Sequence, residues 1–202
     1  MISSMIQFVW IHLIQIMWLA LLIYWVLGTG GLKAVERRES QAQRVSHLVP
    51  MLTAALLLIL PERDLGVLAV PFMERTWTGY SIGVVLVVLG CAYAILARRY
   101  LGANWSGSVT LKQDHSLVQS GPYRYIRHPI YTGLMASVIM TVAAKGTTLA
   151  LVGGMMLVVG WTLKARFEER FLAAELGAAG YATYRARVPM LLPFGGKREV
   201  SS

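Results

Sequence analysis

Hydrophobic residues make up 56% of the 202-residue chain, and charged residues make up only 14%. A soluble domain carries about 25% charged residues, so this composition argues against a soluble globular protein. The net charge of +9 does not indicate nucleic-acid binding, because the basic residues stand in separate blocks between apolar runs and not on one water-facing surface.

Five apolar stretches follow one another along the chain. They cover residues 5–27, 45–60, 77–96, 130–144 and 147–163. The first and third are long enough for a membrane-spanning helix, which needs about 20 residues. Only Lys145 and Gly146 separate the fourth from the fifth, which predicts a tight helical hairpin. We therefore predict an all-α, polytopic membrane protein with about five transmembrane helices.

The segments around these stretches refine the prediction. Residues 61–76 carry two prolines and five charges, so we expect a loop at the membrane interface. The first 32 residues contain no Lys or Arg, so we expect no cleavable signal peptide. Cys91 is the single cysteine and lies inside an apolar run, which excludes an intrachain disulfide and indicates a packing residue. We expect no metal site.

The basic residues predict the topology. Sixteen of the 19 Lys and Arg residues fall in the loop after the first stretch, in the connection 98–129 and in the C-terminal region. Cytoplasmic loops are enriched in Lys and Arg. We therefore expect the N-terminus outside, the C-terminus in the cytoplasm, and both 98–129 and 164–195 on the cytoplasmic side.

The residues Arg127-His128-Pro129 form the first candidate binding element. Proline favours the first position of a helix, so His128-Pro129 predicts the start of the fourth helix at the membrane surface. Free backbone N–H groups, the helix dipole and the Arg127 charge would together suit a carboxylate. A plain interfacial helix start, with Arg127 reaching toward lipid head groups beside a belt of tyrosines, explains the pattern equally well.

Glu168 and Glu169 form the second candidate element, among basic residues directly after the fifth stretch. Adjacent helical residues diverge by about 100°, so both cannot face one ligand atom. We expect one carboxylate to accept from a ligand ammonium or hydroxyl group and the other to pair with an arginine. The alternative is a solvated helix with weak intrahelical ion pairs.

Four segments together resemble the isoprenylcysteine carboxyl methyltransferase family. They are LGANWSG, HSLVQSGPYRYIRHPIYTG, EERFL and YATYRARVPMLLPF, in the family's order and rough spacing across residues 98–195. Phospholipid methyltransferases and sterol reductases share the RHPxYxG element more loosely, whereas its combination with the following EE and RVP–PF elements is more specific. Lys164 and Phe167 depart from the pattern, because relatives often carry further Arg or acidic residues there.

The resemblance implies a membrane-embedded methyltransferase that uses S-adenosylmethionine and is unrelated to the soluble Rossmann type. Residues 1–97 would form transmembrane helices 1–3 and residues 98–202 the methyltransferase core, within one structural domain. The cofactor pocket would lie on the cytoplasmic side, between the 98–129 connection and the C-terminal region. The implied cofactor-binding residues are His115, Leu117, Val118, Gly121, Tyr123, Arg127, His128, Pro129, Tyr131, Glu168 and Glu169.

The implied acceptor is the carboxylate of a lipid-modified, prenylcysteine-like amphiphile that enters from the bilayer among membrane lipids. An ionised carboxylate needs no general base, but it needs a cation and a dry pocket. By its match to the RVP element Arg187 is the candidate cation, although an anionic-lipid contact would explain it equally well. Asn104 is expected to line the same pocket.

The residue types also leave other acceptors open. If the nucleophile were an amine, Glu168, Glu169 or His128 could accept its proton. A phospholipid-amine or small-thiol methyltransferase is therefore the main alternative, and an NADPH-dependent lipid reductase is a weaker one. The sequence does not indicate the oligomeric state.

The topology can be tested by labelling introduced cysteines in sealed cells, after replacement of Cys91. We expect Leu32→Cys and Ser202→Cys both to be protected from an impermeant reagent added outside. Labelling of both would contradict the orientation. Labelling of Ser202→Cys alone would contradict the odd number of spans.

Overall fold

The computed structural model describes residues 2–28, 35–38, 41–59, 70–74, 76–105, 110–112, 117–175 and 178–193. Six α-helices make up most of these residues. They are α1 (Ile2–Leu27), α2 (Gln41–Ile59), α3 (Trp77–Leu101), α4 (Pro129–Lys145), α5 (Thr148–Glu175) and α6 (Ala178–Arg187). Two short 3₁₀ helices, η3 (Gly102–Asn104) and η4 (Gly121–Arg124), lie in the connection between α3 and α4.

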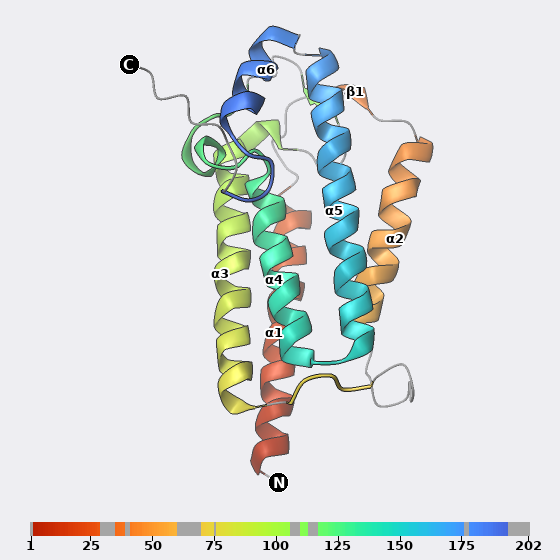
Figure 1. Ribbon diagram of the computed structural model, residues 1–202, viewed down its shortest axis with the longest axis vertical. Helices are drawn as coiled ribbons and strands as arrows, with labels where there is room; N and C mark the ends of the chain where they lie inside the picture. Colours follow the sequence, from red (N-terminus) through yellow and green to blue (C-terminus); the bar gives the residue numbers. More distant parts are fainter. Residues whose placement is uncertain are drawn as a thin grey trace.

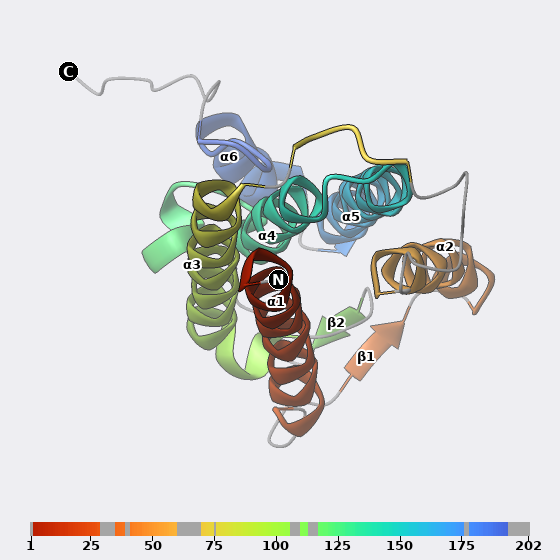
Figure 2. The same ribbon diagram turned by 90° about the horizontal axis from the view of Figure 1, so that it is seen from below.

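Helices α1 to α5 run side by side along the long axis, and α6 crosses one end of them (Figure 1). Helix α4 packs most extensively against α3, and α5 packs against α2 and α4. The view from below shows α1 lying against α3 and α4, while α2 lies against α5 (Figure 2). The N-terminus lies at the opposite end of the molecule from α6 (Figure 1).

Two of the described helices, α3 and α5, are long and apolar enough to cross a membrane, judged by length and composition. Three shorter apolar helical segments, His12–Leu27, Leu48–Leu58 and Pro129–Lys145, accompany them. Large apolar side chains such as Leu89 and Val159 point outward and are more than half exposed. Such outward apolar faces are what lipid contact requires, while the count of five spans stays a prediction.

The all-α prediction is confirmed for the bundle, but the described residues also contain two strands. Strands β1 (Val35–Arg38) and β2 (Thr110–Lys112) pair antiparallel and form a small ribbon that the sequence patterns did not predict. This ribbon joins the loop after α1 to the connection after α3. Residues 35–38 and 110–112 therefore lie side by side.

The hairpin between α4 and α5 is confirmed. Gly146 ends α4 in the left-handed conformation with φ of 63°, and its N–H donates to the Val142 carbonyl. Residues before α3 brace this turn, because the Phe72 N–H donates to the Gly146 carbonyl at 2.9 Å and the Thr148 N–H donates to the Val70 carbonyl at 3.0 Å. Of the predicted interfacial loop 61–76, only residues 70–74 and 76 belong to the described part of the chain.

Buried cations fasten the two N-terminal helices to the rest of the bundle. The guanidinium of Arg98 donates to the carbonyls of Tyr24 and Gly28 at the end of α1, at 3.1 and 2.7 Å. The Lys145 ammonium donates to the Leu58 carbonyl at the end of α2, at 2.6 Å. The last carbonyls of a helix lack partners within it, and a cation there also complements the helix dipole. These contacts therefore hold the C-terminal ends of α1 and α2 in place, although neither end carries a sequence motif of its own.

Small residues allow α3 and α4 to approach closely. A Cβ atom built on Gly90 would lie 2.8 Å from the Gly133 carbonyl oxygen, and one built on Gly133 would lie 2.6 Å from the Gly90 carbonyl oxygen. The buried hydroxyl of Ser137 lies 3.2 Å from the Val87 carbonyl across the same seam. Helix α4 is thereby held firmly on α3, and it carries the candidate binding element at its start.

We predict that Gly90→Leu lowers the thermal unfolding midpoint in detergent by several degrees or prevents folding. The new side chain must force the two backbones apart, and overpacking costs about 1–3 kcal/mol or more. Ala92→Leu, on the exposed side of the same helix, is the control and should leave the midpoint almost unchanged. Equal midpoints for both variants would contradict the close seam.

Candidate functional site

The start of α4 is held in place by the C-terminal segment. His128 is the N-cap residue and Pro129 is the first residue of the helix, as predicted. The N–H groups of Arg127 and His128 donate to the carbonyls of Pro189 and Met190, each at 3.0 Å. These two amides, which precede the first residue of α4, are therefore not available to an anion.

The His128 imidazole lies between the two glutamates of α5. Its Nδ1 is 3.5 Å from Glu168 Oε2, and its Nε2 is 3.3 Å from Glu169 Oε1. Adjacent helical residues diverge by about 100°, yet the two ring nitrogens of His128 reach one carboxylate each. The consequence is a close cluster in which one residue of α4 contacts both acidic residues of α5.

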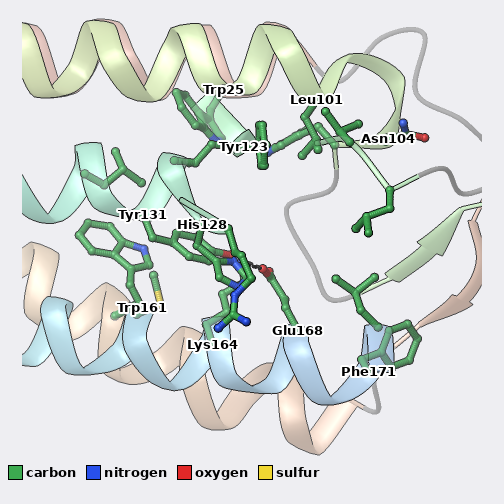
Figure 3. A pocket seen from close by; sticks show the side chains of 18 of the residues that line it. Trp25, Leu101, Asn104, Tyr123, His128, Tyr131, Trp161, Lys164, Glu168 and Phe171 are labelled. Carbon is green, nitrogen blue, oxygen red and sulfur yellow. Dashed lines mark hydrogen bonds and ion pairs between the residues drawn. The ribbon is translucent and has the colours of Figure 1, made fainter. Parts of the chain in front are cut away.

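Tyrosine and arginine side chains complete this cluster. The Tyr131 hydroxyl donates to Glu168 Oε1 at 2.6 Å, and its ring stacks on His128 with centroids 5.7 Å apart (Figure 3). Arg127 Nε lies 2.8 Å from Glu169 Oε1, and Arg185 Nε of α6 lies 3.7 Å from Glu169 Oε2. Glu169 is therefore the member of the pair that meets arginine.

The environment of His128 favours its protonated form. Burial by itself opposes the charge, but the hydrogen bonds and charges of Glu168 and Glu169 outweigh it and raise the pKa of His128 above its usual value. Burial, with a contribution from Glu169, also raises the pKa of Tyr184 to about 12. The neutral Tyr184 hydroxyl donates to the Tyr123 carbonyl at 2.6 Å and so ties α6 to η4.

A cavity of about 510 Å³ opens beside this cluster. Its inner part is apolar and is lined by Trp18, Leu21, Met51, Leu134 and Trp161. A polar belt follows, made of Arg127, His128, Tyr131, Lys164 and Glu168. Its outer part, toward the C-terminal end of α5, is lined by aliphatic and aromatic side chains, namely Leu117, Val118, Tyr123, Phe171, Tyr181 and Tyr184.

The cavity gathers many of the predicted site residues. Those that line it are Asn104, Leu117, Val118, Tyr123, Arg127, His128, Tyr131 and Glu168. Gly121, Pro129 and Glu169 lie next to these residues without lining the cavity. Gly121 has φ of 57° and packs its backbone against the Tyr100 ring, while Pro129 and Glu169 are buried around His128. The prediction for His115 falls outside the described residues.

Arg187, the predicted acceptor cation, is not brought into this group. It is the last residue of α6, its side chain is exposed, and it is absent from the cavity wall. The cationic side chains that do line the wall are those of Arg127 and Lys164, besides His128.

Several wall residues were not among the predicted site residues. Lys164 stands four positions before Glu168 on α5, and this spacing places both on one helix face, so the sequence did carry a pattern that could have found it. Trp161, one turn earlier, follows the same pattern. The wall residues of α1 and α2 had no such pattern, because their place depends on how those helices dock.

Comparisons with known proteins find similarity to isoprenylcysteine carboxyl methyltransferases and to a thiol methyltransferase. Residues 83–174 match the isoprenylcysteine carboxyl methyltransferase (ICMT) family model. The chain is 33% identical over 122 residues to the protein-S-isoprenylcysteine O-methyltransferase of Saccharomyces cerevisiae, covering 56% of this chain and 48% of that protein. It is 30% identical over 125 residues to a methanethiol S-methyltransferase of Mycobacterium tuberculosis, covering 58% of this chain and 46% of that protein. The chain thus spans about half the length of these relatives.

A solved structure shares the fold. It is that of the eukaryotic intramembrane Ras methyltransferase ICMT, with a TM-score of 0.52 and 20% sequence identity. The match covers 77% of this chain and 54% of that one. At this identity the likeness shows the arrangement of helices and nothing more.

We predict a pH dependence of stability that comes from His128. Since its pKa is raised on folding, the cluster stabilises the folded state most fully below pH 6.5, and this stabilisation is lost as the pH rises through the raised pKa. The thermal midpoint in detergent should fall over that range, and His128→Asn should flatten the fall. The exposed His12→Asn is the control, and an equal slope for both variants would contradict the cluster's contribution.

Proposed function

Over residues 83–174 this chain belongs to the isoprenylcysteine carboxyl methyltransferase family, and on that premise we propose that it methylates the carboxylate of a lipid-modified, prenylcysteine-like acceptor. S-adenosylmethionine is the proposed methyl donor, and the membrane surface is the proposed place of reaction. The relatives' names support the acceptor class. The cavity supports the way in which such an acceptor would bind.

The observation that carries the proposal is the continuity between the inner part of the cavity and the polar belt. Helices α1, α2, α4 and α5 line the inner part with Trp, Leu and Met side chains, which suit a hydrocarbon chain. The belt begins directly beside them, with Lys164 one turn after Trp161 on α5. An amphiphile whose chain fills the inner part would therefore place its polar head at the charged residues.

The residues of the belt and the outer part also fit S-adenosylmethionine. Glu168 offers a carboxylate to an ammonium group or to ribose hydroxyls, and Arg127 offers a guanidinium to a carboxylate. Leu117, Val118 and the neighbouring aromatic rings offer apolar surface to the adenine base. When bound, the cofactor supplies an electrophilic methyl group on a sulfonium centre.

The chain's own residues would act by holding and orienting, without moving a proton. A carboxylate acceptor is ionised near neutral pH, so its oxygen forms the new C–O bond without a general base. The Tyr131 hydroxyl and His128 hold Glu168 in one orientation. A fixed carboxylate costs little reorganisation during reaction, which is the main advantage of a preorganised site.

We also propose the finer topology of five spans, an outside N-terminus and a cytoplasmic polar belt. The asymmetry of the basic residues supports this orientation. The pairing of β1 with β2 is consistent with it, since the ribbon brings the loop after α1 to the same end as α6 (Figure 1). The oligomeric state is left open.

A small-thiol acceptor is the second candidate function, because the methanethiol S-methyltransferase of Mycobacterium tuberculosis is a relative at 30% identity. A thiol must lose its proton to become a good nucleophile. A group of the polar belt would have to accept that proton, while a molecule as small as methanethiol would leave the inner part unfilled. The extended apolar wall therefore favours the amphiphile.

The proposal is tested by methyl transfer with purified protein and radiolabelled S-adenosylmethionine. We expect a farnesylated cysteine analogue with a free carboxylate to be methylated and its carboxamide to be inert. An ethanolamine phospholipid and a small thiol serve as competing acceptor classes. Methylation of either of these, with the carboxylate ignored, would replace the proposal by the corresponding alternative.

Cofactor binding gives a separate prediction. His128→Ala and Glu168→Ala should each weaken binding of S-adenosylhomocysteine at least tenfold, or about 1.4 kcal/mol, in calorimetry in detergent. The first removes the residue that orients Glu168, and the second removes the carboxylate itself. Arg170→Ala, exposed on the same helix, is the control. Unchanged affinity in both folded variants would mean that the cofactor binds elsewhere.

A further inference from the structure

Lys164 occupies a distinctive place on α5. Its side chain is buried, with 8% of the residue exposed, and it lines the cavity between Trp161 and Glu168. These three residues are spaced by three and four positions, so they follow one another along a single helix face. Trp161 belongs to the apolar inner part and Glu168 to the polar belt, so Lys164 marks the boundary between them.

The surroundings of Lys164 connect it to the site cluster. Its Nζ lies 5.8 Å from the centre of the Tyr131 ring, whose hydroxyl donates to Glu168 (Figure 3). Tyr131 therefore interacts both with the Lys164 ammonium and with Glu168, the residue proposed to bind the cofactor. Burying an ammonium is costly, so a buried lysine on the wall of a cavity points to a function.

Lys164 itself has an electrostatic partner in Glu168: burial opposes the charge of that carboxyl, but the hydrogen bond from His128 and the charge of Lys164 outweigh it and lower the pKa of Glu168. The other cations of this region have different places. Arg127 forms its ion pair with Glu169 at 2.8 Å and also donates to the Arg185 carbonyl at 3.0 Å. His128 lies between two carboxylates. The side chains of Arg166, Arg170 and Arg187 are exposed.

The net charge of the cluster adds to this picture. Arg127, Lys164 and Arg185 carry three positive charges, and Glu168 and Glu169 offset two of them. One positive charge therefore remains among these five residues even when His128 is neutral, which favours an anion at the boundary. An acceptor carboxylate would supply that anion.

We propose that Lys164 binds the carboxylate of the acceptor and so selects anionic head groups; this inference rests on the proposed function. An acceptor with its chain beside Trp161 would present its head group to the Lys164 ammonium, next to the cofactor part of the cavity. In the transfer one carboxylate oxygen bonds to the methyl carbon, the S–C bond breaks, and its electron pair stays on sulfur. The resulting ester is uncharged, so its ion pair with Lys164 is lost, which favours release of the product into the bilayer.

The test compares Lys164→Met with Arg166→Met, which removes an exposed cation two positions away. We expect Lys164→Met to raise the KM for a farnesylated cysteine acceptor at least tenfold, while Arg166→Met stays within twofold of wild type. Affinity for S-adenosylhomocysteine should stay within twofold in both. Lys164→Met should also lose the preference for a carboxylate inhibitor over its carboxamide, and Lys164→Arg should recover part of that preference.

The other outcomes overturn the inference in distinguishable ways. An unchanged KM and preference in Lys164→Met would contradict it while the wild-type reaction upholds the proposed function. A tenfold loss of S-adenosylhomocysteine affinity with an unchanged KM would assign Lys164 to the cofactor instead. If the wild type ignores every carboxylate acceptor, the proposed function fails and the inference fails with it. Lys164→Gln is measured in parallel, so that the comparison holds if the methionine variant does not fold.

Discussion

The rest of the site depends on the contacts that His128 makes with Glu168 and Glu169, between which it lies. Removing one partner from a buried ionic group leaves an uncompensated charge, so such clusters are stable only when all members are present. Here the members come from the start of α4 and from α5, and Arg185 of α6 contacts Glu169 as well. The cluster therefore ties together the three helices that enclose the polar belt.

The segment that follows α6 is hydrogen-bonded to the start of α4. Backbone carbonyls of residues 189–191 accept from Arg127, His128 and the Thr132 hydroxyl. The RVP–PF and RHP elements are far apart in sequence, and these bonds bring them together at one site. The inner part of the cavity depends on different contacts, since Arg98 and Lys145 hold the ends of α1 and α2.

Local physical rules made part of this structure predictable. Proline after His128 predicted where α4 begins, and Lys145-Gly146 predicted the turn of the hairpin. The adjacent Glu168 and Glu169 predicted that one of them would pair with an arginine, and that one is Glu169. Each of these follows from one or two neighbouring residues and does not depend on the rest of the fold.

The remaining features depend on contacts between distant segments. Spacing within α6 does not show that the Arg187 side chain is exposed, because that depends on how α6 packs against η4. The amides of Arg127 and His128 looked free because their acceptors lie some 60 residues later in the chain. The apolar wall from α1 and α2 was equally hidden, since most residues of those helices are apolar and no pattern marks the face that points inward.

The central claim is that a lipid chain occupies the inner part of the cavity while its carboxylate head lies at the polar belt. The most direct measurement is photolabelling with an acceptor analogue that carries a photoreactive group at the end of its prenyl chain, followed by mass spectrometry. We predict labels on Trp18, Leu21, Met51 or Trp161, suppressed by unlabelled acceptor. Labels confined to outward residues such as Leu89 and Val159, or labels that acceptor does not suppress, would contradict the account.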